Sequence, residues 1–154
     1  MKLEEIKNAT VVWGALSEEG ITFLKNRGGV VVVAEGRPGL VGLYHNVELL
    51  KKENIEFVYC VDNVLGLLFY KGKIGKMLVM CKKIELGVLG RPGSLQAALL
   101  SKIHGVSVEF MVEGEFDFES RDKGAASLGG KMMVLGNDCG GCVVLGKDEV
   151  LGEI

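Results

Sequence analysis

Five short segments of this 154-residue sequence combine charged, polar or small residues in ways that could bind a ligand. Each follows an apolar run, and they are Trp13–Ala15, Glu35–Arg37, Asp62–Asn63, Cys81–Lys83 and Gly90–Ser94. In an open α/β sheet, ligands bind at the carboxyl ends of the strands, where such segments would lie together. The sequence therefore predicts one candidate ligand edge, and its side chains limit the chemistry available there.

Gly90–Ser94 offers the most specific chemistry of the five segments. Arg91 supplies a cation, while Gly93 and Ser94 would stand at the start of a helix, whose unbonded N–H groups and dipole attract anions. The alternative is an ordinary turn from strand to helix with Pro92 at the first helical position, and spacing alone favours that turn. A Walker lysine pattern and an intact GxGxxG motif are both missing, so no triphosphate or dinucleotide site is indicated.

The remaining polar groups have simpler interpretations. Asp62 and Asn63 close a strand, and either could cap the helix that follows. Lys82 is typical of a solvated strand end. His45 and His104 lie in helical segments without a nearby nucleophile or acid, which favours structural roles over membership of a catalytic triad.

The four cysteines divide into two pairs. Cys60 and Cys81 each end an apolar run, which is typical of buried, unreactive thiols. Cys139 and Cys142 form a CxxC between two apolar runs, without the second CxxC or nearby histidine that a zinc site would need. This favours a structural or incidental role and leaves a disulfide, or metal or redox chemistry, as alternatives. We expect no metal and no cofactor.

Composition excludes several partners. The net charge is −2, so neither nucleic acid nor an anionic membrane surface is indicated as a partner. No apolar run reaches the ~18 residues of a spanning helix, and the charged N-terminus lacks a secretory signal, so we expect a cytoplasmic protein. The abundance of Glu, Lys and Val leans towards a thermophilic source.

Strand and helix patterns alternate along the chain. Apolar runs at 10–14, 30–35, 54–62, 76–81 and 106–112 predict strands, and the segments 17–29, 40–53, 63–72 and 95–105 predict helices. This order implies βαβ units with right-handed crossovers, hence a three-layer, Rossmann-like α/β domain with a mainly parallel sheet. Residues 113–130 predict loop, and 131–146 predict a C-terminal β-hairpin. We expect residues 1–154 to form one domain.

The segments together resemble the C-terminal half of a known superfamily. It contains the alpha, beta and delta subunits of translation initiation factor 2B, methylthioribose-1-phosphate isomerase and archaeal ribose-1,5-bisphosphate isomerase. Three motifs carry the resemblance over about residues 28–112, and weakly over 10–16: "EGRPGLVG", "DNVLG" and "GRPGSLQAALLSKIHGVSVEF". The positions that match the first two are Glu35, Arg37, Pro38, Gly42, Asp62, Asn63 and Gly66.

Several positions depart from the family pattern. Val12 or Trp13 stands where the family's isomerases have a catalytic cysteine, and Lys82 stands where they have a catalytic aspartate. Gly90-Arg91 replaces an Asn-Lys pair that binds substrate phosphate. The 154 residues carry no counterpart of the family's N-terminal helical domain, and residues 113–154 diverge. Because proton transfer needs a positioned acid–base pair, isomerase activity of the family kind is not expected.

The resemblance implies three alternative functions. The first is a non-catalytic, self-associating domain, a homodimer, that binds a phosphorylated small metabolite. The second is a sugar-phosphate isomerase with altered chemistry, using Asp62 or Lys82 as acid–base groups. The third is a partner-binding subunit related to translation initiation. In the first, Glu35 and Arg37 brace the site, and the ligand-binding candidates are Glu35, Arg37, Asp62, Asn63, Arg91, Gly93 and Ser94.

Overall fold

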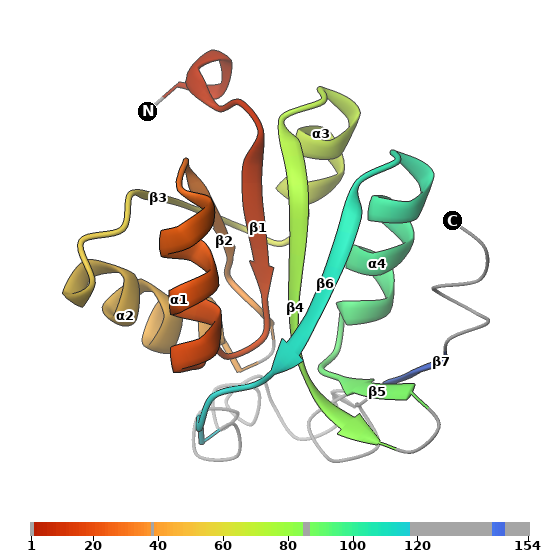
Figure 1. Cartoon of the computed structure of the whole chain (residues 1–154). Helices are drawn as coiled ribbons and strands as arrows, with labels where there is room; N and C mark the ends of the chain where they lie inside the picture. The colour runs from red at the N-terminus through yellow and green to blue at the C-terminus, as the bar shows by residue number, and fades with distance from the viewer. Residues whose placement is uncertain (1, 38, 85–86, 118–142, 147–154) are drawn as a thin grey trace, which may run out of the picture.

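The computed structural model describes residues 2–37, 39–84, 87–117 and 143–146. Its centre is a mostly parallel sheet with helices on both faces, which confirms the three-layer, Rossmann-like prediction (Figure 1). The strands are β1 (Ala9–Trp13), β2 (Val31–Ala34), β3 (Phe57–Cys60), β4 (Ile74–Ile84), β5 (Gly87–Gly90), β6 (Ser107–Val112) and β7 (Val143–Gly146).

Parallel pairing gives the order β3-β2-β1-β4-β6, and β5 and β7 are antiparallel additions. β1 lies between β2 and β4, with Val11 opposite Val32 on one side and Met77 on the other. Every residue of β1 and of β2 is buried. An uninterrupted apolar sequence is what a strand covered on both faces requires.

The α-helices of the described chain cover the two faces of the sheet. α1 (Glu18–Arg27) and α2 (Val47–Lys52) pack on one face, and α3 (Val64–Tyr70) and α4 (Ser94–Ile103) pack on the other. A 3-10 turn, η1 (Leu3–Glu5), precedes β1, and one π-helical turn, η2 (Gly42–Asn46), leads directly into α2. Within the described residues, no helix combines the length and apolar character needed to cross a membrane.

Local sequence signals account for the ends of α1. The Ser17 side chain accepts a hydrogen bond from the Gly20 amide at 3.3 Å, and Glu18 and Glu19 occupy the positive end of the helix dipole. Gly28 follows α1 with a φ of 65°, a left-handed conformation that glycine adopts at little cost.

Two local expectations need correction, and a third lies mostly outside the described residues. β4 extends to Ile84, so Lys82 lies within a strand, opposite Leu89 of β5, rather than at a strand end. Helix α4 begins at Ser94 after Gly93, so Pro92 is not its first residue. Of the expected 131–146 hairpin, only 143–146 is described, as a strand paired with β5. Cys139 and Cys142 lie outside the described residues.

Candidate functional site

The chain leaves β2 through a tight bend that depends on two glycines. The Glu35 amide still bonds to the Cys60 carbonyl of β3 at 2.9 Å, and Gly36 then takes a φ of +72°. The turn η2 returns against the end of β2 so closely that a Cβ on Gly42 would overlap the Ala34 carbonyl. Only glycine allows this approach without a shift of backbone.

Asp62 holds this bend from the end of β3. Its two carboxylate oxygens accept the Gly36 amide at 2.8 Å and the Arg37 amide at 2.9 Å. Asp62 therefore does not cap α3 with its side chain, and Asn63, at the N-cap position, makes no capping hydrogen bond either. The capping prediction is wrong for both residues, because the neighbouring bend offers Asp62 two unbonded amides.

Glu35 and Arg37 form a loose ion pair on the same bend. Arg37 Nε lies 3.4 Å from Glu35 Oε1, with side-chain exposures of 67% for the arginine and 13% for the glutamate. Burial raises the pKa of Asp62, an effect partly offset by the hydrogen bonds from the Arg37 and Gly36 amides. The bend therefore presents an exposed guanidinium above two carboxylates that are largely withdrawn from solvent.

Arg91 is engaged by a residue that the sequence did not suggest. Its Nη2 and Nε donate to the two oxygens of Glu113, at 2.9 and 3.2 Å. Glu113 follows β6, its side chain is 7% exposed, and its amide donates to the Cys81 carbonyl at 2.9 Å. This bidentate ion pair joins the turn before α4 to the end of β6. In this structure the guanidinium that was expected to bind phosphate is therefore bound to Glu113.

Trp13 fills the space between the sheet and the start of α4. Its indole Nε1 donates to the Pro92 carbonyl at 3.0 Å, and the ring, in a residue 5% exposed, lies where a Cβ on Gly93 would stand. The cavity that remains beside Trp13, Asp62 and Asn63 measures about 20 Å³. That volume suits a water molecule and is far too small to enclose a sugar phosphate.

The chain as a whole is similar to proteins of one known family. Residues 7–121, well over half of the chain, match the profile of the Initiation factor 2 subunit family. The chain belongs to this family. The putative methylthioribose-1-phosphate isomerase of Aeropyrum pernix is 35% identical over 78 residues, which are 49% of this chain and 21% of that protein.

Two solved structures share the fold of this family member. The 5-methylthioribose 1-phosphate isomerase of Pyrococcus horikoshii superposes with a TM-score of 0.59 and 14% identity, over 70% of this chain and 35% of that one. The delta subunit of translation initiation factor eIF-2B from A. fulgidus gives 0.60 and 16%, over 70% and 36%. The chain thus spans about a third of these structures and a fifth of the curated relative.

The two catalytic candidates of this family member lie apart. Asp62 is half-buried at the end of β3, whereas Lys82 is exposed on the part of β4 that extends beyond β6 to pair with β5. No hydrogen bond or ion pair between them is found in the described part of the chain. The two side chains come from different parts of the sheet, the end of β3 and β4, with β2 and β1 between these strands.

The described cysteines are poor nucleophiles. Burial, with the nearby Asp62 and Glu35 carboxylates, raises the pKa of Cys60 to about 11. Burial and Glu113 also raise the pKa of Cys81 to about 11. Both remain thiols at neutral pH. Among the described residues, no group of three or more His, Cys, Asp or Glu side chains is placed to hold a metal.

Asn46 is a further site-forming residue that sequence reasoning missed. It is 1% exposed, its Nδ2 donates to the Gly14 carbonyl at 2.9 Å, and its Oδ1 accepts the Leu16 amide at 2.9 Å. These two bonds fix the loop after β1, and His45 Nε2 lies 2.8 Å from the Leu16 carbonyl oxygen. The sequence indicated this role only by placing one amide side chain, Asn46, in a mostly apolar segment that was expected to be helical.

Proposed function

We propose that this member of the Initiation factor 2 subunit family is a non-catalytic, self-associating domain. The observation that carries the proposal is the outer face of α3 and α4. Large apolar residues stand exposed there: Leu67 (46%), Tyr70 (74%), Leu99 (40%) and Ile103 (75%). Lys102 is the single charged residue in the two helices. Adjacent apolar positions of this kind mark an interaction surface.

A second copy of the chain is the occupant that best fits this face. A two-fold interface places the same surface against itself, so like charges within it repel. The two helices contain no acidic residue and one basic residue, Lys102, and Lys71, directly after α3, places its ammonium 5.5 Å from the centre of the Tyr70 ring. Repulsion between two copies would therefore come from these few lysines alone. Burial of the leucine, tyrosine and isoleucine side chains would then supply the favourable free energy.

Sedimentation velocity can test self-association. We expect the wild type to be a dimer and Leu67→Glu and Ile103→Glu each to shift it towards monomer, because a carboxylate would be buried in the interface. Leu43→Glu is the matched control, since Leu43 is 38% exposed on η2, outside this face, and the dimer should persist. A monomeric wild type, or equal dissociation of the control, contradicts the proposal.

The absence of catalysis is proposed from three features at the ligand edge. Asp62 is committed to two backbone amides, Lys82 lies on β4, separated from β3 by β2 and β1, and Trp13 fills the adjoining space. We therefore expect no turnover of methylthioribose 1-phosphate or ribose 1,5-bisphosphate by purified protein. Turnover that disappears in Asp62→Asn would overturn this proposal in favour of an isomerase with altered chemistry.

A specific observation also favours binding of a phosphorylated small molecule at the start of α4. The Ser94 hydroxyl is fully buried and is without a hydrogen-bond partner in the described structure, beside the first amides of a ten-residue helix. A buried hydroxyl without a partner is costly, and an anion at this helix end could accept its hydrogen bond. Arg37, exposed at the same edge, could add a cation.

Calorimetric titration with inorganic phosphate tests this second proposal. We expect binding that weakens in Ser94→Ala and Arg37→Ala. Ser101→Ala is the control, because Ser101 is also buried in α4 but donates to the Ala97 carbonyl at 2.9 Å. Arg91→Ala should weaken binding only if phosphate displaces Glu113. No heat of binding, or equal weakening in the Ser101 control, argues against the site.

A further inference from the structure

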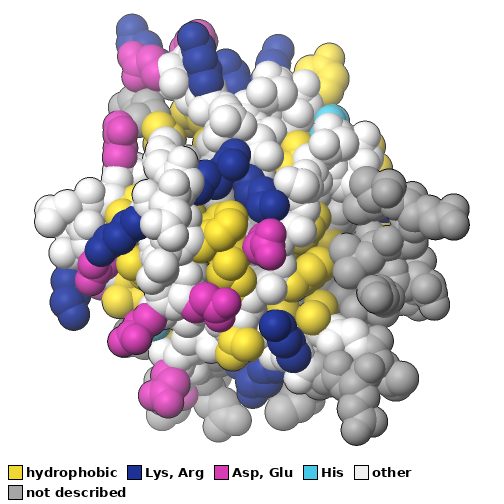
Figure 2. Space-filling model, in the orientation of Figure 1, with side chains coloured by type: hydrophobic (Ala, Val, Ile, Leu, Met, Phe, Trp, Pro, Cys, Tyr) yellow, Lys and Arg dark blue, Asp and Glu magenta, His cyan; other side chains and the backbone are white. Residues whose placement is uncertain are grey.

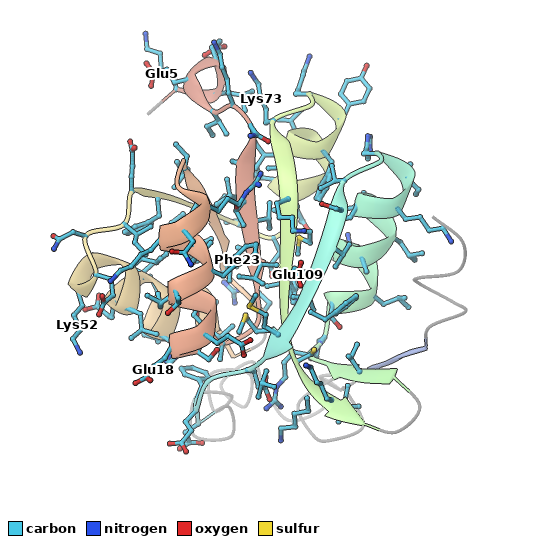
Figure 3. The ribbon with its side chains drawn as sticks, viewed as in Figure 1. Glu5, Glu18, Phe23, Lys52, Lys73 and Glu109 are labelled. Carbon is cyan, nitrogen blue, oxygen red and sulfur yellow. The ribbon has the colours of Figure 1, made fainter. Side chains whose placement is uncertain are left out.

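A hollow beside α1 and α2 is separate from the α3–α4 face and from the Trp13 region. It is an open groove of about 800 Å³ between α1 and α2, ending at residues 112–115 that follow β6. Its lining includes Leu16 and Ser17 before α1 and then runs along the helix from Glu18 to Lys25, about 10 Å at the rise of an α-helix. Figure 3 labels Glu18 and Lys52, which mark its α1 and α2 sides.

The floor of the groove is apolar. Leu16 precedes α1, Ile21 belongs to α1, Leu49 comes from α2, and Val112 ends β6. Leu16 and Ile21 are only 1% and 8% exposed, so the accessible apolar surface comes mainly from the half-buried Leu49 and from Val112, which is 47% exposed. The wall at residues 113–115 is fixed in place, because the Gly114 amide donates to the Ala15 carbonyl at 2.8 Å and Gly114 packs against the Leu16 carbonyl. The hollow is thus bounded by ordered backbone on three sides.

The rim of the groove carries excess negative charge. Glu18, Glu19 and Glu115 are exposed there, and no ion pair joins any of them to another described residue. Other charges of the lining are neutralised: Lys25 pairs with Glu53 across the groove at 2.6 Å, and Glu113 pairs with Arg91. Lys52 is the remaining cation of the described lining. Figure 2 shows acidic side chains gathered around the lower part of this face.

We propose that this groove binds a basic amphipathic segment of a partner protein. Leucine-like side chains of the segment would pack on the apolar floor at Leu49 and Val112, while lysine or arginine residues would face Glu18, Glu19 and Glu115. Laying an apolar stripe into a groove between helices is a recurrent mode of peptide recognition. The opposite charges at the rim would steer association and fix orientation.

The shape of the groove favours a peptide segment over a compact organic cation. A small-molecule site encloses most of its ligand, whereas this groove is open along the length of α1 and has its unpaired charges on the rim. The three acidic groups are also spread over two segments, the start of α1 and the chain after β6.

Fluorescence anisotropy with the full chain tests the proposal. The probe is a labelled peptide with leucines at helical spacing on one face and lysines on the other. We expect saturable binding that weakens with salt, and about tenfold weaker binding to Glu18→Lys/Glu19→Lys. Glu4→Lys/Glu56→Lys is the matched control, because it changes net charge equally at two exposed sites outside the groove, and it should change binding less than twofold.

Two further arms separate binding in the groove from nonspecific attraction between opposite charges. Glu115→Lys lies outside any helix, so it should also weaken binding several-fold even if the α1 substitutions disturb folding. A peptide with its leucines replaced by serine should bind at least about tenfold more weakly, because the apolar floor would be unused. The proposal is overturned if the wild type does not bind the leucine–lysine peptide, or if the control pair weakens binding as much as Glu18→Lys/Glu19→Lys does. It is also overturned if spermine or the serine peptide binds as tightly as the leucine–lysine peptide.

Discussion

Replacing Arg91 with methionine tests whether this arginine is held for structure. The substitution keeps a long side chain but removes the guanidinium that donates to both oxygens of Glu113. The carboxylate left behind is only 7% exposed, so water can compensate it poorly. Loss of one partner from a fully buried ion pair costs about 3–5 kcal/mol, and loss from an exposed pair costs at most about 1.

Arg91 itself is 25% exposed, which places this pair between those limits. We expect Arg91→Met to lower the free energy of unfolding by about 2 kcal/mol, which for a chain of this length lowers Tm by roughly 4–8 °C. Glu113→Gln keeps one acceptor for the arginine, so its cost should be about 1 kcal/mol. The double variant should be more stable than the sum of the two changes predicts, by about 1 kcal/mol.

Urea denaturation followed by circular dichroism measures these differences, with Arg37→Met as the control. Arg37 is 67% exposed and 3.4 Å from its partner, so its replacement should cost less than about 0.5 kcal/mol. If Arg91→Met costs no more than Arg37→Met, the Glu113 pair contributes nothing to stability. Arg91 would then be available to a ligand, and the reasoning that assigns it to the framework would be refuted.

Three further predictions concern the bend after β2 and the end of β4. Gly42→Ala should destabilise the protein by about 2 kcal/mol or more, because the Cβ of the new alanine would overlap the Ala34 carbonyl. Gly66→Ala should stabilise α3 slightly, because no atom lies within 4 Å of the position of its Cβ. Thermal melts of the two variants test this difference. Because the pKa of Asp62 is raised in the folded state, the folded protein binds the Asp62 proton more tightly than the unfolded chain does. The free energy of unfolding should therefore fall as pH rises from about 4 through the folded pKa. Asp62→Asn should reduce this dependence on pH, and an unchanged dependence would contradict the assignment to Asp62. In a Cys139→Ser/Cys142→Ser variant at pH 8, Cys81 should react with a thiol reagent only at the rate of unfolding, because it is fully buried and its pKa is about 11. Rapid reaction of both remaining thiols, Cys60 and Cys81, would contradict this prediction.

The positions of the main strands and helices could be predicted because each depends on a local signal. The stretch at 30–35 lacks the regularly spaced polar residues of an amphipathic helix and is too short to form a buried helix. It therefore indicates a strand covered on both faces. Ser17 and Gly28 delimit α1 by capping chemistry, and both act as expected. The resemblance to the family rested on several motifs in a fixed order, so it remained recognisable although many individual positions differ from the family pattern.

The contacts at the ligand edge could not be predicted because they join residues distant in sequence. Asp62 had an evident local use as a helix cap, yet two amides 25 and 26 positions earlier were better placed to bond it. Glu113 gave no signal as the partner of Arg91, since the end of a strand and the start of a helix meet there only in the folded sheet. The β4–β5 hairpin was missed because Lys82 and Lys83 look like a solvated strand end.

Trp13 gives this protein a natural optical probe. It is the only tryptophan in the chain, it is 5% exposed, and its indole N–H is bonded to the Pro92 carbonyl at the start of α4. The intrinsic emission of the unmodified protein therefore comes from a single, shielded position between the sheet and α4. Any event that moves α4 away from β1 would shift that emission to longer wavelength, so the junction can be followed in real time without a label.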